Sequence, residues 1–129
     1  MESNAGKTRG DFGENAVCDY LFERGYEITA RNYRKRCGEI DIIAVFGNEI
    51  AFVEIKTRKR GGLTTGFSAI TKEKQRRMVK TAQAFLKENP RCGGKSVRFD
   101  AAEVTVGRGA PPELIGIEYY ENAFEPMLL

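Results

Sequence analysis

Two apolar segments separated by the dipeptide Gly47-Asn48 constrain the fold of this chain more than any other feature. Segments 40–46 and 49–56 are rich in Ile, Val, Ala and Phe, and a two-residue connection of this kind typically joins antiparallel strands in a type I′ or II′ hairpin. Odd and even positions along both segments are apolar, as in strands that are covered on two faces rather than one. The sequence therefore predicts a hairpin buried inside a sheet.

The remaining segments predict helices and further strands around this hairpin. Asp11 and Thr71 suit the N-caps of two helices, and Gly25 and Pro90 follow their expected ends. The expected elements are a helix over 11–24, strands over 28–33, 40–46 and 49–56, a helix from 71 to about 88, and strands over 97–106 and 114–120. This order predicts an α/β fold with a mixed central β-sheet flanked by helices. A chain of 129 residues has the size of one domain, so we expect a flexible N-terminus over 1–10 and a single domain over 11–129.

Composition excludes several kinds of function. The chain contains no histidine, so a Ser-His or Cys-His nucleophilic site is excluded, and any catalysis depends on carboxylates, lysine or a metal. Cys18, Cys37 and Cys92 are odd in number and widely spaced, and are therefore expected to be free thiols rather than disulfides or zinc ligands. No apolar run approaches the roughly 20 residues that cross a bilayer, and the N-terminal residues lack the apolar core of a secretory signal. We therefore expect no membrane contact and a cytoplasmic location.

The positive charge is concentrated in one part of the chain. Segment 56–80 carries nine Lys or Arg residues and one acid, whereas the formal net charge of the whole chain is +3. Such a segment is typical of a contact with a polyanion, most often nucleic acid, although a solvated loop and helix face explains the charge equally well. The predicted nucleic-acid contacts are Arg58, Lys59 and Arg60, which follow the second hairpin strand, and Lys74 on the second helix.

The hairpin also brings charged residues together. If the turn has two residues, the strand register places Asp41 opposite Glu54 and Glu39 opposite Lys56. Side chains alternate along a strand, so these four groups are expected to share one face at one end of the hairpin. Glu39 has a second interpretation, a salt bridge at the rim with Arg34 or Lys35.

Two opposed carboxylates predict a cation between them. Like charges repel, and burial raises the pKa of a carboxyl group, unless a positive group lies nearby. Carboxylate oxygens suit Mg²⁺ or Mn²⁺, and Lys56 could orient an attacking water or stabilise negative charge developing on a phosphate. The alternative is a charged hairpin end in which Asp41 and Glu54 pair with Lys56 and nearby arginines.

These motifs resemble a known nuclease superfamily. Asp41, followed after a hairpin turn by Glu54-Ile55-Lys56, resembles the motif of the PD-(D/E)XK nucleases, which share the restriction-endonuclease-like fold; Ile40 stands where that motif has proline. More closely, the chain resembles the YraN-like family of small bacterial proteins from about Gly10 to Phe124. It is also similar to the archaeal Holliday-junction resolvases, which share the helix glutamate and the Gly-Glu-Ile-Asp strand. The positions that carry the YraN-like resemblance are Gly10, Gly13-Glu14, Gly25-Tyr26, Asn32-Tyr33-Arg34, Gly38-Glu39-Ile40-Asp41, the segment 52–58, Lys74 and Arg98-Phe99-Asp100.

The resemblance implies roles for individual residues. It implies Asp41, Glu54 and Lys56 as the catalytic set, with Asp41 and Glu54 as metal ligands and Glu14 completing the metal shell. Glu14 falls on the apolar stripe of the first helix, so its carboxylate should point toward the sheet; the alternative is an acid favoured by the helix dipole. Asp100 is expected to pair with Arg98 and is not counted as catalytic.

Three functions follow as hypotheses. The first is a Mg²⁺- or Mn²⁺-dependent endonuclease that hydrolyses DNA phosphodiester bonds, including those of branched or structured DNA. The second is a non-catalytic nucleic-acid-binding module that keeps the nuclease fold. The third is a protein-interaction subunit with an acidic partner. The apolar tail 126–129 predicts docking on the domain or on a second copy of the chain, which would form a homodimer.

Overall fold

The computed structural model describes residues 5–61 and 70–126. Two helices, a short 3-10 helix and five strands make up this part of the chain. The elements are α1 (Ala5–Glu23), β1 (Glu27–Lys35), β2 (Gly38–Phe46), β3 (Glu49–Lys59), α2 (Lys72–Glu88), η1 (Pro90–Cys92), β4 (Ser96–Val106) and β5 (Leu114–Tyr120).

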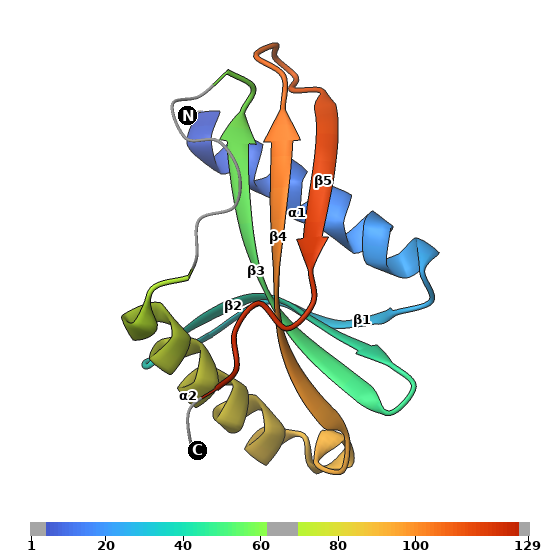
Figure 1. Ribbon diagram of the computed structural model, residues 1–129, viewed down its shortest axis with the longest axis vertical. Helices are drawn as coiled ribbons and strands as arrows, with labels where there is room; N and C mark the ends of the chain where they lie inside the picture. Colours follow the sequence, from blue (N-terminus) through green and yellow to red (C-terminus); the bar gives the residue numbers. More distant parts are fainter. Residues whose placement is uncertain (1–4, 62–69, 127–129) are drawn as a thin grey trace.

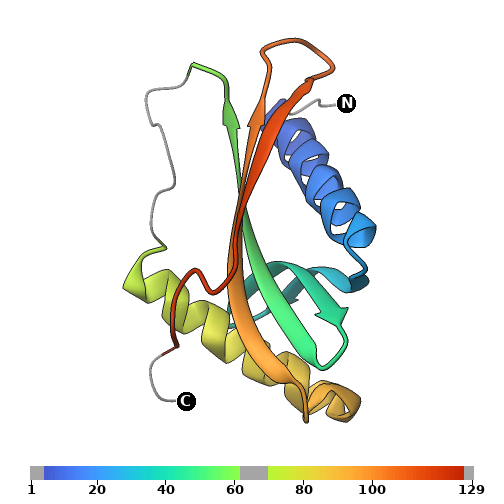
Figure 2. The ribbon, with the colours of Figure 1, turned by 45° about the vertical axis from the view of Figure 1, so that its right-hand side comes forward.

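The five strands form one mixed sheet in the order β1-β2-β3-β4-β5. β3 and β4 are parallel, and the other neighbouring pairs are antiparallel. The two helices lie on opposite sides of the sheet, and α2 connects the parallel pair (Figures 1 and 2). This confirms the predicted α/β architecture, which is consistent with a restriction-endonuclease-like fold. Within residues 5–61 and 70–126, no helix combines the length and the apolar composition needed to cross a membrane.

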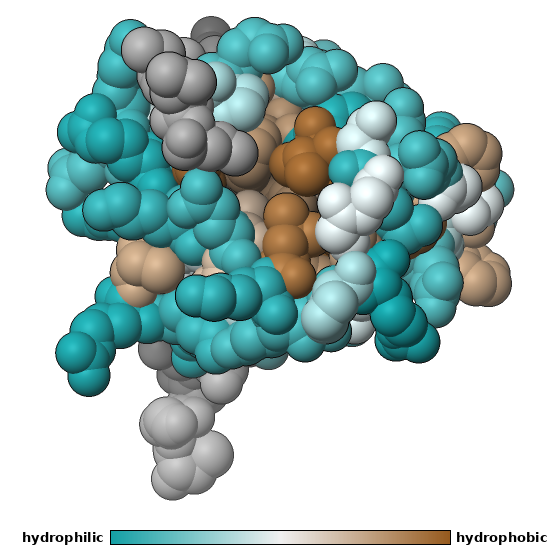
Figure 3. Space-filling view, turned by 90° about the horizontal axis from the view of Figure 1, so that it is seen from below, coloured by the Kyte–Doolittle hydropathy of each residue, from teal (hydrophilic) through white to brown (hydrophobic). Residues whose placement is uncertain are grey.

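Both faces of the central strands are buried, as the two-faced apolar pattern predicts. One core lies on the α2 side and contains Ile43, Phe52 and Phe99, while the other lies on the α1 side and contains Ile42 and Val53. Seen from below, the surface is mostly hydrophilic, with apolar side chains showing in a central hollow (Figure 3). A sheet covered on both faces holds its strands in a fixed register, because a slip by one residue would exchange the two cores.

The β2–β3 hairpin has the predicted two-residue turn. Pairing runs from Phe46 opposite Glu49 to Ile42 opposite Val53, and Gly47 takes a positive φ of 59°, which glycine adopts without steric cost. The paired ladder ends at Ile42 and Val53, one residue before the position where the register would place Asp41 opposite Glu54. The two acids therefore lie where the strands begin to separate.

Element boundaries otherwise follow local sequence signals, with two exceptions. β3 continues to Lys59 rather than ending at Lys56, so Arg58 and Lys59 lie on the strand and not after it as expected. The Thr71 side chain accepts a hydrogen bond from the backbone N–H of Lys74 at 3.1 Å, which confirms the N-cap of α2. The expected helix start at Asp11 is wrong, because α1 begins at Ala5; Gly6 and Gly10 lower helix propensity and obscure this first part. The rest of the predicted N-terminal segment, 1–4, lies outside the described residues. The three cysteines are free thiols, as expected.

Two glycines allow the helices to approach the strands that carry the acids. A Cβ atom on Gly13 would lie 2.1 Å from Oγ1 of Thr57, and one on Gly38 would lie 2.9 Å from Oγ1 of Thr81. Gly13 therefore lets α1 lie directly on β3, and Gly38 lets the start of β2 lie against α2. Together they fix both helices close to the open end of the hairpin.

Candidate functional site

Asp41 connects β2 to β3 beyond the last paired residues. Its Oδ2 atom accepts a hydrogen bond from the backbone N–H of Ile55 at 2.8 Å, so a side chain takes the place of the next backbone pair. The prediction that Asp41 lies beside Glu54 is supported, since both acids line the same pocket. The bond, however, is to the residue after Glu54.

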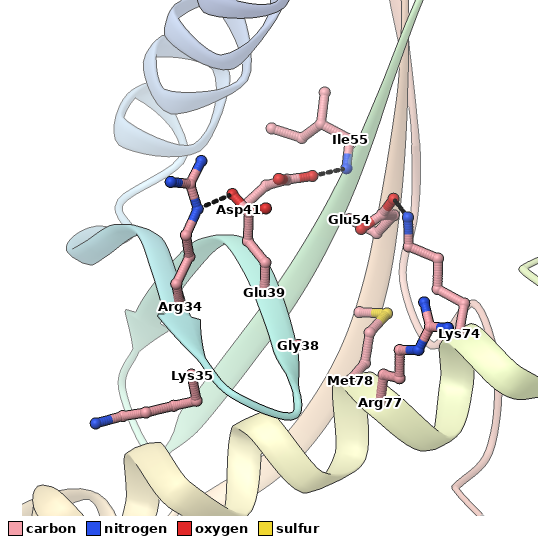
Figure 4. A pocket seen from close by; sticks show the side chains of 10 residues that line it. All are labelled: Arg34, Lys35, Gly38, Glu39, Asp41, Glu54, Ile55, Lys74, Arg77 and Met78. Atoms are coloured by element: carbon pink, nitrogen blue, oxygen red, sulfur yellow. Dashed lines mark hydrogen bonds and ion pairs between the residues drawn. The ribbon is translucent and has the colours of Figure 1, made fainter.

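Asp41 and Glu54 line one pocket of about 510 Å³ between β1, β2, β3 and α2. Figure 4 shows the two carboxylates inside the pocket, with basic side chains around them. The lining residues are Arg34, Lys35, Gly38, Glu39, Asp41, Glu54, Ile55, Lys74, Arg77 and Met78.

Among the described residues, a single basic side chain, that of Lys74, forms an ion pair with either of the two pocket acids. Glu54 is 6% exposed, and its Oε2 lies 2.6 Å from Nζ of Lys74. The pKa of Asp41 is raised from 3.8 to about 7, first by burial, then by Glu54 and, less strongly, by Glu39, while the Ile55 N–H and Lys74 act in the opposite direction. The pocket thus favours a proton or another cation at Asp41 near neutral pH.

Glu14 is positioned differently from its predicted metal role. Its carboxylate is buried on α1, where it accepts hydrogen bonds from Nε of Arg31 at 2.8 Å and from Nδ2 of Asn32 at 3.0 Å. Asn32 has a φ of 52°, a left-handed conformation that asparagine tolerates better than most residues. In the described part of the chain, no three His, Cys, Asp or Glu side chains are grouped closely enough to hold a metal ion. The expected convergence of Glu14 with the other two acids is therefore not seen.

Lys74, rather than Lys56, lies beside Glu54 in the pocket. Lys56 is half-buried and shares a face with Glu54 by strand alternation, but it is not among the described residues that line the pocket. Lys74 instead pairs with Glu54. The spacing of Lys74 and Met78 by four on α2 predicts this side, because a buried Met78 places the lysine on the face of the helix toward the sheet.

The predicted nucleic-acid contacts on β3 are not equivalent. Nε of Arg58 lies 2.5 Å from Oε2 of Glu103, and their side chains are 23% and 7% exposed. Lys59 and Arg60 are exposed, and the Arg60 backbone N–H donates to the Val106 carbonyl. Arg58 is thus held against the sheet by an ion pair that the sequence did not predict. The side chains of Lys59 and Arg60 remain accessible to a ligand.

Two expected ion pairs are confirmed. Nε of Arg34 lies 3.2 Å from Oε2 of Glu39 at the rim of the pocket. Asp100 is fully buried and lies 2.9 Å from Arg98; it also accepts hydrogen bonds from the Tyr119 hydroxyl and the Asn122 backbone N–H. These contacts indicate that Asp100 stabilises the fold and does not bind a ligand.

Comparison with known proteins places the chain in a family. Residues 13–104 match the family described as "Uncharacterised protein family UPF0102". A UPF0102 protein of Rhodococcus opacus (strain B4) is 42% identical over 115 residues, covering 89% of this chain and 94% of the relative. A UPF0102 protein of Synechococcus sp. (strain JA-3-3Ab) is 38% identical over 118 residues, covering 90% of each chain. The family match spans both pocket acids, and the chain belongs to the UPF0102 family, the YraN-like family that its sequence motifs resemble.

Proposed function

We propose that this protein is a metal-dependent endonuclease that hydrolyses phosphodiester bonds of DNA, including branched or structured DNA. The observation that carries the proposal is the pair of largely buried carboxylates, Asp41 and Glu54, in one pocket with Lys74 as the cation beside Glu54. The resemblance of Asp41, Glu54 and Lys56 to the PD-(D/E)XK motif supports the same proposal. Asp41 and Glu54 together carry more negative charge than one ammonium group balances.

The donor atoms fit Mg²⁺ or Mn²⁺. Magnesium keeps several waters and is usually bound through one or two carboxylates plus substrate phosphate, which is the donor set that Asp41 and Glu54 provide. When bound, the ion supplies an activated water and stabilises charge on the phosphate. Of the protein groups, Asp41 and Glu54 would hold the ion, Lys74 would contact the substrate phosphate beside Glu54, and Lys56 would stabilise charge on the reacting phosphate from the same face of β3.

Cleavage assays test this proposal directly. Purified protein is incubated with single-stranded, duplex and branched DNA in Mg²⁺ or Mn²⁺, with EDTA as a control. We expect metal-dependent cleavage that Asp41→Asn abolishes and Lys56→Ala slows. Absence of cleavage on all three substrates, or cleavage that survives Asp41→Asn unchanged, contradicts the proposal.

One observation favours a second candidate, a non-catalytic nucleic-acid-binding module. Lys74 already neutralises Glu54, and Arg31 and Asn32 already bind Glu14, so the acids have protein partners without a metal. For such a module, calorimetric titration would show no Mg²⁺ or Mn²⁺ binding, while DNA binding would persist and weaken with salt.

A cytoplasmic location and a homodimer formed through segment 126–129 also stay predictions. Residues 127–129 lie outside the described residues.

A further inference from the structure

The pocket acids are bordered by arginines that the sequence did not select as nucleic-acid contacts. Arg34 comes from β1 and Arg77 from α2, and both line the pocket. Their side chains are 72% and 58% exposed. In Figure 4 they lie on either side of the carboxylates, with Lys74 next to Arg77. We name Arg34, Lys74 and Arg77 the basic rim.

The backbone holds the two walls of the basic rim together. Gly38 ends the short turn after β1, and a Cβ atom there would lie 3.2 Å from Cβ of Arg77. The turn that follows Arg34 therefore packs against α2 at Arg77. Arg34 and Arg77 project from elements in contact with each other, so both can bind one ligand without ordering of the backbone between them.

The rim arginines form ion pairs with exposed acids, which a phosphate group can replace. Arg34 pairs with Glu39, which is 39% exposed, and Arg77 with Glu73, which is 67% exposed. Surface ion pairs of this kind contribute roughly 0–1 kcal/mol, and a phosphate, which an arginine binds through two parallel hydrogen bonds, can replace them. Arg58 differs, since its partner Glu103 is 7% exposed, and removing the partner of a buried pair leaves an uncompensated charge.

We propose that Arg34 and Arg77, with Lys74, are the phosphate contacts that seat a DNA backbone over Asp41 and Glu54, and that Arg58 is not such a contact. This inference rests on the proposed function for the identity of the site, but it concerns DNA binding and not cleavage. The phosphates compensate the basic rim, and the rim offsets the repulsion between the DNA and the two acids beneath it.

Fluorescence anisotropy with a labelled duplex of about 20 base pairs, in EDTA and at several salt concentrations, tests the proposal. We compare Arg34→Gln/Arg77→Gln with a control of equal charge, Arg24→Gln/Arg91→Gln, whose arginines are exposed, one directly after α1 and the other on η1. The rim variant is expected to bind about tenfold more weakly, and its salt slope should fall by about 1.8, since each phosphate contact contributes about 0.9. The control should keep its slope.

A second comparison guards against a folding defect. Arg34→Lys/Arg77→Lys keeps both charges and should recover most of the affinity, while all variants should unfold at the same temperature as the wild type. Equal weakening by the rim and control variants, or an unchanged slope in the rim variant, overturns the proposal. Because no metal is present, loss of binding in the rim variant supports the inference even if the wild type does not cleave DNA.

Discussion

Asp41 and Asp100 are two aspartates removed from solvent in the same sheet, and their surroundings differ in kind. Asp100 is 0% exposed, yet it receives hydrogen bonds from Arg98, the Tyr119 hydroxyl and the Asn122 backbone N–H. Asp41 receives a bond from the Ile55 N–H and has two acids, Glu54 and Glu39, acting on it. The first carboxylate is compensated by the fold, whereas the second is compensated only in part.

This difference separates a structural acid from a candidate functional one. A buried charge is costly unless it is paired and hydrogen-bonded, so a fold that keeps an undercompensated pair such as Asp41 and Glu54 has a reason beyond stability. Strongly perturbed carboxyl groups in clefts are frequent at functional sites. Burial alone would have selected Asp100, while the balance of charge selects Asp41.

The largest expected effect is on stability, when Asp100, the compensated aspartate, is replaced. Asp100→Asn removes the buried ionic partner of the Arg98 guanidinium, which is 8% exposed and keeps the half-exposed Glu49 as a charged partner. It should lower the free energy of unfolding by about 3–4 kcal/mol. Chemical denaturation followed by circular dichroism measures it. A loss below about 1 kcal/mol would mean that the two aspartates are not as different as their contacts suggest.

Asp41→Asn should have the opposite effect at high pH. The pKa of Asp41 is raised from 3.8 to about 7, so the folded state keeps a proton that the unfolded state releases, and this stabilisation is complete below pH 3.8 and is lost as pH rises through 7. In EDTA, wild-type stability relative to Asp41→Asn should therefore fall by about 2–4 kcal/mol between about pH 4 and pH 8. A stability difference that is constant with pH would show that the surroundings of Asp41 do not favour its protonated form.

A divalent ion should supply the compensation that Asp41 lacks. At about pH 7.5, a saturating concentration of Mn²⁺ should stabilise the wild type by about 2 kcal/mol and Asp41→Asn by much less. Glu88→Gln is a matched acid-to-amide control, because Glu88 is an exposed acid at the end of α2 that binds Lys35. Equal stabilisation of all three proteins would indicate that the ion binds elsewhere.

Sequence reasoning reached the parts of the site that local signals determine. The Gly47 turn fixes the register that brings Asp41 to Glu54, and Thr71 fixes the start of α2. It missed contacts between elements far apart in the chain. The Arg58–Glu103 pair depends on the parallel register of β3 and β4, in which Lys56 lies opposite Glu103, and no turn connects those strands to set it.

The positions of the two site lysines also depend on contacts between elements far apart in the chain. Strand alternation puts Lys56 on the correct face, but it does not say how far that face is covered by α2. The Lys74–Glu54 pair depends on how α2 crosses the sheet, which packing at Gly38 and Met78 decides. Periodicity within a helix predicts which side faces the sheet, and not which strand residue it meets.

The smallest expected effect concerns Glu14, which the family resemblance assigns to the metal shell. Glu14→Gln keeps an oxygen that can accept a hydrogen bond from Arg31 or Asn32, but it removes the charge that pairs with Arg31, whose side chain is 42% exposed. The free energy of unfolding should therefore fall by about 1 kcal/mol. Because the carboxylate is bound to Arg31 and Asn32 on the α1 side, Mn²⁺ stabilisation should be the same as in the wild type. If Glu14→Gln loses that stabilisation as fully as Asp41→Asn does, Glu14 must leave its partners to join the metal, and the two sides of the sheet would then form one site rather than two.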